Sequence, residues 1–360
     1  MIPRQCVAVA LVAGVAVFAS VAPARAQWSI SSSDGKAVFN LGFLAQAQLE
    51  ELESPGSHDY AQNAFVRRLR LVAGGRVDDR TSFFIDTDVP NLGKGQATGA
   101  KVANSMVLQD AVLTEALGCG VKLDAGMLMV PVSHNSLQAA GTLLAVDYGP
   151  YSFLQSDPTD SRVNRDYGVD ARASLATRHA ELRAGLYQGN RGTGSAGPFR
   201  TTVRAVWYPF DADTGFFYAG TAFGRRRLVA IGGGYDAQAG YHAWAGDVSV
   251  DWPVAGDCLT FQADYVHYDG GVTFAALGRQ AAVLVETGYF IRRLSLTPYV
   301  QYASRDYEAP ALPREAKLQA GLAYWCNGHR NSLKLGVARL MRDGAADGAQ
   351  YVAQWQVLAF

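Results

Sequence analysis

Arginine residues recur in segments whose alternate positions are apolar. Arg68 and Arg70 flank Leu69, and comparable alternation returns further along the chain. The later arginines of this kind are Arg172, Arg183, Arg200 and Arg204. Successive side chains of an extended strand point to opposite faces, so the arginines of one segment share a face. Because the guanidinium group stays charged at any relevant pH and presents a rigid set of N–H donors, such a face can attract and orient anions.

Residues that could support catalysis or bind a metal form no recognisable constellation. The six histidines are scattered without H-x-x-x-H or H-E-x-x-H spacing, and no G-x-S-x-G motif or phosphate-binding glycine loop occurs. Three cysteines follow residue 26, and none belongs to a C-x-x-C pair: Cys119, Cys258 and Cys326. The sequence therefore predicts no catalytic residue, no cofactor and no metal site.

The segments that carry the arginines are about ten residues long and are bounded by Gly, Asp, Asn or Pro. In residues 37–49, for example, Phe39, Leu41 and Phe43 lie on one face, with Asn40 and Gln46 on the other. The polar faces of other segments include charges that lipid would reject, so those faces must look inward. This pattern predicts an all-β protein, a transmembrane antiparallel β-barrel.

We expect about sixteen strands, since a single-chain bacterial barrel with both ends on one side needs an even number. The expected strands are 37–49, 64–77, 80–88, 105–117, 120–130, 166–176, 179–188, 199–208, 228–236, 241–252, 258–268, 280–291, 294–303, 315–326, 330–341 and 349–360. A further extended stretch, 214–223, is interpreted as a periplasmic connection. Sixteen strands leave room for an aqueous channel.

A soluble β-sandwich also alternates apolar and polar residues. Three observations favour the membrane barrel instead. Short turns alternate with longer loops, aromatic residues gather at strand ends, as in Trp207-Tyr208 and Tyr324-Trp325, and the chain ends on the aromatic residue Phe360.

Residues 1–26 read as a cleaved signal peptide: Arg4 precedes an apolar stretch, and Ala24-Arg25-Ala26 is a cleavage motif. Residues 27–360 would then form a single barrel domain in the outer membrane of a Gram-negative bacterium. Without Arg4 and Arg25, 30 basic residues stand against 32 acidic ones, a net charge of −2. This balance gives no reason to expect nucleic acid as a partner. Outer-membrane lipids are the expected surroundings.

The connection 131–164 stands out because it spans 34 residues and contains the apolar stretch LLAVDYGPYSFL. Loops of this length are usually functional or disordered, and an apolar one is expected to fold into the barrel. We interpret it as an infolded third extracellular loop that forms the pore constriction, or alternatively as an extracellular lid or a contact between protomers. Its candidate constriction residues are His134, Asp147, Asp157, Asp160 and Arg162.

The three aspartates against one arginine give this loop a balance of 1 − 3 = −2. One hypothesis is that the six arginines, together with Asp86 and Asp88, line the pore and face the acidic loop, setting a transverse field that sorts ions. The alternative is that the arginines form ordinary salt bridges with Asp86, Asp88, Asp170 and Glu181. The sequence leaves both open.

The returning end of the loop carries a charged pair followed by a glycine. Arg165 and Asp166 are expected to anchor the loop at the mouth of the next strand, and Gly168 suits a crowded position beside the infolded segment.

Several stretches together resemble the phosphate-selective porin O and P family across nearly the whole mature chain. They are FVRRLRLVAGGRVDDRTSFFIDTDVP (65–90), DAVLTEALGCGVKLDAGMLMVPVS (110–133), NRDYGVDARASL (164–175), LRAGLYQGN (182–190) and LTPYVQY (296–302). The resemblance implies a homotrimer of 16-stranded barrels with an infolded third loop, through which small hydrophilic solutes or anions diffuse. Family members that select phosphate are expected to have lysines near the constriction, and this chain has few, so the resemblance does not fix phosphate as the solute.

A competing function is a barrel that sheathes an electron-carrying partner in a larger assembly. A sheath needs an unobstructed lumen, whereas a porin needs residues 131–164 folded inside. A third possibility, an adhesin or receptor, would need longer surface loops than this chain has.

Overall fold

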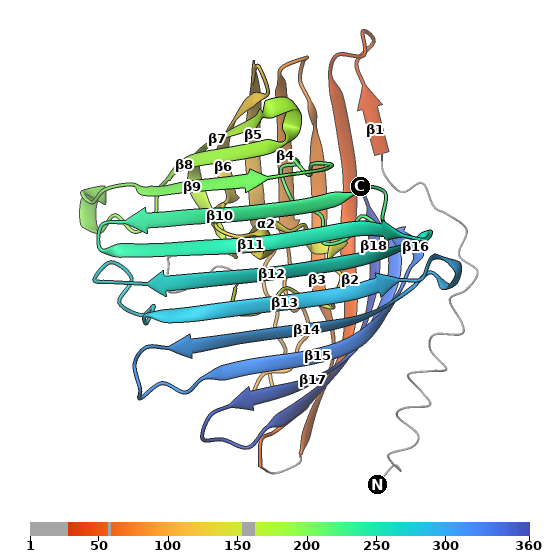
Figure 1. Ribbon diagram of the computed structural model, residues 1–360, viewed down its shortest axis with the longest axis vertical. Helices are drawn as coiled ribbons and strands as arrows, with labels where there is room; N and C mark the ends of the chain where they lie inside the picture. Colours follow the sequence, from red (N-terminus) through yellow and green to blue (C-terminus); the bar gives the residue numbers. More distant parts are fainter. Residues whose placement is uncertain (1–27, 57–58, 153–162) are drawn as a thin grey trace.

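The computed structural model describes residues 28–56, 59–152 and 163–360. The expected signal peptide lies outside the described residues, as do Asp157, Asp160 and Arg162. Within the described part of the chain, sixteen antiparallel strands close into a barrel (Figure 1). They are β2 (Val38–Glu53), β3 (Tyr60–Arg76), β4 (Thr81–Asp88), β5 (Val107–Gly118), β6 (Val121–Met129), β7 (Arg165–Leu175), β8 (Ala180–Tyr187), β9 (Arg200–Trp207), β10 (Leu228–Gln238), β11 (Tyr241–Val254), β12 (Asp257–Asp269), β13 (Gln280–Phe290), β14 (Leu296–Tyr307), β15 (Glu315–Tyr324), β17 (Asn331–Arg342) and β18 (Gly348–Ala359).

The predicted sixteen-stranded barrel is confirmed, and the strand boundaries agree within a few residues. The stretch 214–223 contains no strand, as expected. Two short strands were not predicted: β1 (Trp28–Ser31) and β16 (Cys326–His329). Each has only four residues, too few to show a clear alternation.

Barrel closure joins the first and last long strands. β18 pairs with β2 from Gln350↔Leu52 to Ala359↔Phe43. The short β1 then pairs with the next part of the same edge, from Trp28↔Leu41. The N-terminal and C-terminal strands therefore follow one another along a single edge of β2.

Apolar side chains are exposed on the outer surface and charged side chains are buried inside, the reverse of a soluble protein. On β8 the side chain of Leu186 is 56% exposed, whereas Arg183, which points inward, is 2% exposed. An apolar outer surface around a polar interior is what a barrel in lipid requires. Aromatic residues at strand ends divide between the two faces: Trp207 points outward, while the adjacent Tyr208 is buried inside.

Helices in residues 28–56, 59–152 and 163–360 are few and short. The α-helix α2 (His134–Leu137) and the 3-10 helix η1 (Ala140–Thr142) lie in the third loop, and three further 3-10 turns join strands: η2 (Ala176–Arg178), η3 (Thr193–Ser195) and η4 (Arg292–Leu294). Among the described residues, no helix is long and apolar enough to cross a membrane.

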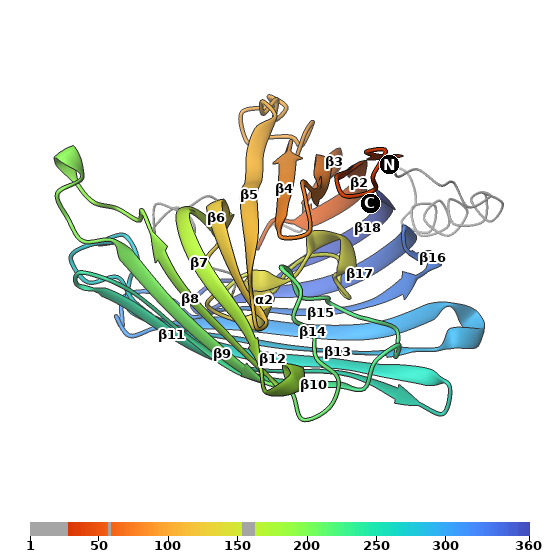
Figure 2. The ribbon, with the colours of Figure 1, turned by 90° about the horizontal axis from the view of Figure 1, so that it is seen from above.

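Two connections fold into the barrel. The first is the predicted third loop between β6 and β7, here called L3 and described for 130–152 and 163–164; the second is residues 208–227 between β9 and β10, here called the insert. Figure 2 shows α2 of L3 surrounded by strands. Side chains from both segments join the wall in apolar clusters, such as the contact of Leu144 and Phe223 with the cluster around Trp325. Much of the interior is therefore packed rather than empty.

Candidate pore and its constriction

All six arginines that alternation placed on one face have buried side chains on the inner side of the barrel. Each also lies close to a carboxylate. Arg70 is 2.7 Å from Asp86 and 3.2 Å from Asp88, two of the partners that the salt-bridge alternative named. The other pairs are Arg68–Asp147 at 2.6 Å, Arg172–Asp124 at 3.1 Å, Arg183–Glu181 at 2.8 Å, Arg200 with Asp236 and Asp166, and Arg204–Asp247 at 2.6 Å.

Four of these eight pairs join neighbouring strands: Arg70 with Asp86 and with Asp88, Arg172 with Asp124, and Arg200 with Asp236. The pair Arg204–Asp247 reaches across one intervening strand. Arg204 on β9 makes two hydrogen bonds to Asp247, whose strand β11 is separated from β9 only by β10. Gly232 on β10 leaves the necessary space, because a Cβ there would lie 2.6 Å from the Asp247 carboxylate. Buried charges are tolerated only when they are paired in this way. Each inner arginine on the strands from β3 to β9 is therefore paired with at least one carboxylate.

Asp147 of L3 is bound by two consecutive arginines. Arg67 donates to Asp147 at 2.8 Å and Arg68 donates at 2.6 Å. A β-bulge makes this possible, since the register of β2 and β3 shifts between Gln46 and Ala47, where Arg67 has no partner residue. Period-two counting would place Arg67 on the outer face, and sequence reasoning therefore missed it.

Electrostatics keep this contact ionised. Burial by itself would raise the pKa of Asp147, but Arg67 and Arg68 outweigh burial and hold that pKa well below the usual range. Tyr148 adds to the contact, since the Arg68 guanidinium lies 5.4 Å from its ring centre. The acidic side of L3 thus touches the arginines of β3 directly.

Glutamine amides from β2, β14 and β18 bind the backbone of L3. Gln356 donates to the carbonyl of Gly141 at 2.8 Å, and Gln301 donates to that of Asp147 at 3.1 Å. Gln46 and Gln354 bind further L3 carbonyls in the same way, at 3.4 and 3.3 Å. An amide can satisfy a buried carbonyl without bringing a charge inside.

Lys334 on β17 is a cation on this same side. Its buried Nζ donates to the carbonyls of Leu143 and Ala145, at 2.5 and 3.0 Å. The ammonium group also lies 5.3 Å from the Trp325 ring centre. Among the described residues no ion pair with a carboxylate is formed by Lys334, so L3 carbonyls are its hydrogen-bond acceptors.

The start of L3 is fixed locally. Ser133 caps α2: its hydroxyl accepts from the backbone N–H of Ser136, while the Ser136 hydroxyl accepts from that of Ser133. The N–H of Asn135 donates to Asp264 on β12 at 2.9 Å. His134 is buried against Tyr218 of the insert, with ring centres 5.2 Å apart, and burial lowers the pKa of His134 to about 4. His134 is therefore neutral near pH 7.

The residues expected to anchor the end of L3 contact different strands. Arg165 makes two hydrogen bonds to Asp110 on β5 and donates to the carbonyl of Val163 at 2.8 Å. Asp166 accepts from the N–H of Gly189 and lies 3.6 Å from Arg200. At Gly168 a Cβ would lie 2.2 Å from the Leu186 carbonyl, so no larger residue fits.

A polar cavity of about 250 Å³ lies between L3 and the wall formed by β2, β3, β15 and β18. Its charged residues, here called the vestibule charges, are Glu50, Arg67, Lys94, Asp147 and Lys317. Lys94 is 2.5 Å from Glu50, and Asp147 is bound by the two arginines. In the described part of the chain, Lys317 has no carboxylate within ion-pair distance.

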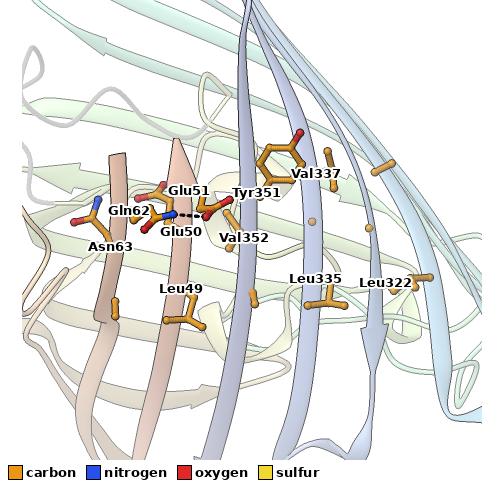
Figure 3. A pocket seen from close by; sticks show the side chains of 15 residues that line it. Leu49, Glu50, Glu51, Gln62, Asn63, Leu322, Leu335, Val337, Tyr351 and Val352 are labelled. Atoms are coloured by element: carbon orange, nitrogen blue, oxygen red, sulfur yellow. Dashed lines mark hydrogen bonds between the residues drawn. The ribbon is translucent and has the colours of Figure 1, made fainter. Parts of the chain in front are cut away.

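A second hollow, of about 760 Å³, lies on the outer face across β2, β3, β15, β17 and β18. Figure 3 shows Leu49, Leu322, Leu335 and Val337 around it. These are the outward-pointing positions of their strands, so the hollow belongs to the apolar exterior and not to the lumen.

Within the described ranges, Cys119, Cys258 and Cys326 are unpaired, and no group of three or more His, Cys, Asp or Glu side chains is arranged to hold a metal ion.

The chain is similar in structure to several outer-membrane proteins. The outer membrane channel DcaP of Acinetobacter baumannii matches with a TM-score of 0.58 and 14% identity, over 91% of this chain and 99% of that one. Salmonella typhi OmpF, in complex with daunomycin, matches with a TM-score of 0.58 and 12% identity, over 91% and 100%. The trimer form of OmpT from Vibrio cholerae matches with a TM-score of 0.53 and 10% identity, over 89% and 99%. At these identities the likeness shows the fold.

A search of curated protein sequences finds no match. The sequence model of the family described as phosphate-selective porin O and P matches residues 39–226, just over half of the chain. The match covers β2 to β9, L3 and the insert, which are the elements that build the charged interior. The chain therefore belongs to the phosphate-selective porin O and P family, and it is a channel of the outer membrane.

Proposed function

We propose that this porin allows passive diffusion of small hydrophilic solutes with a weak preference for anions, and that solutes enter through the cavity lined by the vestibule charges. The observation that carries the proposal is the uncompensated ammonium group of Lys317. The compensated arginines of β3–β11 offer solutes no free charge, so selectivity depends on the vestibule instead.

The charge balance of the vestibule is positive. Three cations, Arg67, Lys94 and Lys317, face two carboxylates, Glu50 and Asp147, which leaves 3 − 2 = +1. A narrow polar cavity between low-dielectric walls concentrates ions of the opposite sign. Because the excess is a single charge and salt screens it over about 8 Å at physiological ionic strength, the preference is weak.

Reversal potentials measured across planar bilayers in a KCl gradient test this proposal. We expect Lys317→Gln to lower the chloride-to-potassium permeability ratio and Lys317→Glu to invert it. Lys36→Gln is the matched control, because Lys36 is exposed in the turn before β2, outside the barrel interior. An unchanged ratio in Lys317→Glu would contradict the anion preference.

The occupied lumen favours this function over the sheath of an electron-carrying partner. A sheath must leave its centre open, whereas L3 and the insert fill much of the interior here. A threaded polypeptide would have to displace segments that bind both each other and the wall.

We also propose that the protein is a homotrimer surrounded by outer-membrane lipids. Support comes from the family membership and from the similarity to OmpT, whose structure is described as a trimer form. Gel mobility in mild detergent before and after heating tests the oligomer. A species that already runs as a monomer without heating would contradict it.

A further inference from the structure

The insert, residues 208–227, enters the barrel from the end opposite L3. L3 connects β6 to β7, and the insert connects β9 to β10. Consecutive strands run in opposite directions, so β6 and β9 end at opposite ends of the barrel. The two segments therefore approach each other from the two openings.

Their junction is built from backbone hydrogen bonds. The N–H of Tyr218 donates to the carbonyl of Leu137 at 3.0 Å, and the N–H of Ala139 donates to the carbonyl of Tyr218 at 2.9 Å. The pairing is a parallel β-bridge between Gln138 and Tyr218. L3 and the insert thus form one continuous internal structure, joined in the way neighbouring strands are.

Gly220 allows the two backbones to meet. Its N–H donates to the Thr142 hydroxyl at 3.0 Å, and a Cβ at this position would lie 2.5 Å from the Thr142 carbonyl oxygen. The three atoms nearest to that Cβ all belong to Thr142 and Leu143 of L3, so a side chain here would push the insert away from L3. The close contact therefore depends on this one glycine.

Three of the inner arginines hold the insert in place. Arg183 donates to the carbonyls of Gly215 and Phe216 at 2.8 and 3.1 Å, and Arg172 donates to that of Thr214 at 3.1 Å. The hydroxyl of Tyr218 donates to Glu181, and the Nε of Arg204 donates to that hydroxyl at 3.4 Å. Arg172, Arg183 and Arg204, three of the six arginines of the pore-lining hypothesis, therefore bind the insert directly.

The insert reaches across the lumen to other strands. Phe217 packs against Phe84 of β4 with ring centres 5.4 Å apart, and Phe223 packs against Trp325 at 4.9 Å. Between these contacts the Thr221 hydroxyl donates to Asp251 of β11 at 3.0 Å. The segment therefore spans from β4 to the region beside β15.

We propose that the insert is a second constriction, which meets L3 inside the lumen and limits the conductance of the channel. This inference rests on the proposed porin function. It assigns the size limit to two segments from opposite openings, joined at Tyr218 and Gly220, rather than to L3 alone.

Single-channel conductance in concentrated KCl tests the inference. In one variant a short Gly-Ser linker replaces residues 214–223, and in the milder one Gly220→Val separates the insert from L3. The control is Gly246→Val, since a Cβ at the exposed Gly246 meets no other atom within 4 Å. Heat-modifiable gel mobility identifies folded barrels before the measurement. We expect a several-fold rise in conductance for the linker variant, a smaller rise for Gly220→Val and none for the control.

The outcomes separate this inference from the proposed function. If the wild-type protein conducts and the folded linker variant conducts equally, the inference is overturned and the porin function stands. If only the variants conduct, the insert closes the lumen completely, which supports the inference and contradicts diffusion through the wild-type pore. If neither folded protein conducts, both ideas fail.

Discussion

The two sides of the inner wall hold their infolded segments by different chemistry. The charged wall is defined by Arg70, Arg165, Arg172, Arg183, Arg200 and Arg204, each paired with a carboxylate. Arg172, Arg183 and Arg204 of this wall also bind the insert. The glutamine wall is defined by Gln46, Gln48, Gln301, Gln319, Gln354 and Gln356. Here neutral amides bind each other and the backbone of L3, and Gln319 donates to the Tyr299 hydroxyl.

The difference shows that many charged residues in a sequence need not leave a charge free to interact with solutes. A buried guanidinium must be matched by a carboxylate, so a wall rich in arginine compensates itself. Amides impose no such requirement. Lys317, which has no carboxylate partner among the described residues and lines the polar cavity, is on the same wall as Gln319.

The largest expected effect comes from breaking one pair of the charged wall. Arg204→Met should destabilise the barrel by about 3 to 5 kcal/mol, because Asp247 would remain buried without its partner. Urea unfolding in detergent micelles measures the change. The double variant Arg204→Met with Asp247→Leu removes both charges and should recover most of the loss. If the double variant is less stable than the single one, the account of compensated charge is wrong.

An equivalent change on the glutamine wall should have a smaller effect. Gln356→Met removes hydrogen bonds to the carbonyls of Gly141 and His329, at 2.8 and 2.7 Å. The expected loss is about 1 to 2 kcal/mol in the same unfolding measurement, because no charge is left unpaired. A loss as large as that of Arg204→Met would remove the distinction between the two walls.

Ion selectivity should respond in the opposite order. Replacing the pair Arg183 and Glu181 together, by Arg183→Gln with Glu181→Gln, keeps the local net charge and should leave the reversal potential unchanged. Lys317→Gln should shift it. This comparison tests whether the vestibule determines ion selectivity. If the reversal potential shifts more in the double variant than in Lys317→Gln, the charged wall determines selectivity instead.

The smallest expected effect concerns acid pH. The pKa of Asp147 lies well below the usual range, so this carboxylate keeps its charge until the pH falls through that depressed value. Asp147→Asn should therefore raise the anion preference at neutral pH, and the difference from wild type should persist at about pH 4, where an ordinary aspartate is half protonated. Reversal potentials at the two pH values check this. Convergence of the two proteins at pH 4 would show that the arginines do not hold Asp147 ionised.

Much of the fold could be predicted because a lipid-facing barrel obliges every strand to alternate. The boundaries of β8 or β12 follow from period two and turn residues alone. The apolar stretch in L3 likewise indicated a buried loop. Alternation and turn residues depend only on neighbouring positions in the chain, so they can be read from the sequence.

The partners of the site residues could not be predicted because they depend on the barrel's closure. A single-residue bulge turns Arg67 inward, against the period-two count. Arg204 and Asp247 are 43 residues apart, and nothing in either segment identifies the other. Lys317 does alternate with Leu318, so its inward direction was readable, but its lack of a partner was not. The insert was expected to be a periplasmic connection, and its position inside follows from contacts of Tyr218 with L3 and the wall.

The closure of β18 against β2 has a kinetic consequence. Gln46 and Gln356, which bind each other across this seam, are 310 positions apart in the chain. Contacts between such distant residues form slowly, and an unpaired strand edge can pair with another molecule in the meantime. The edge of β2 therefore stays unpaired, and able to pair with another chain, until the last dozen residues form β18. Transport to the outer membrane without aggregation requires that this edge be covered until the barrel closes. Deletion of β18 would leave the β2 edge unpaired in the folded protein.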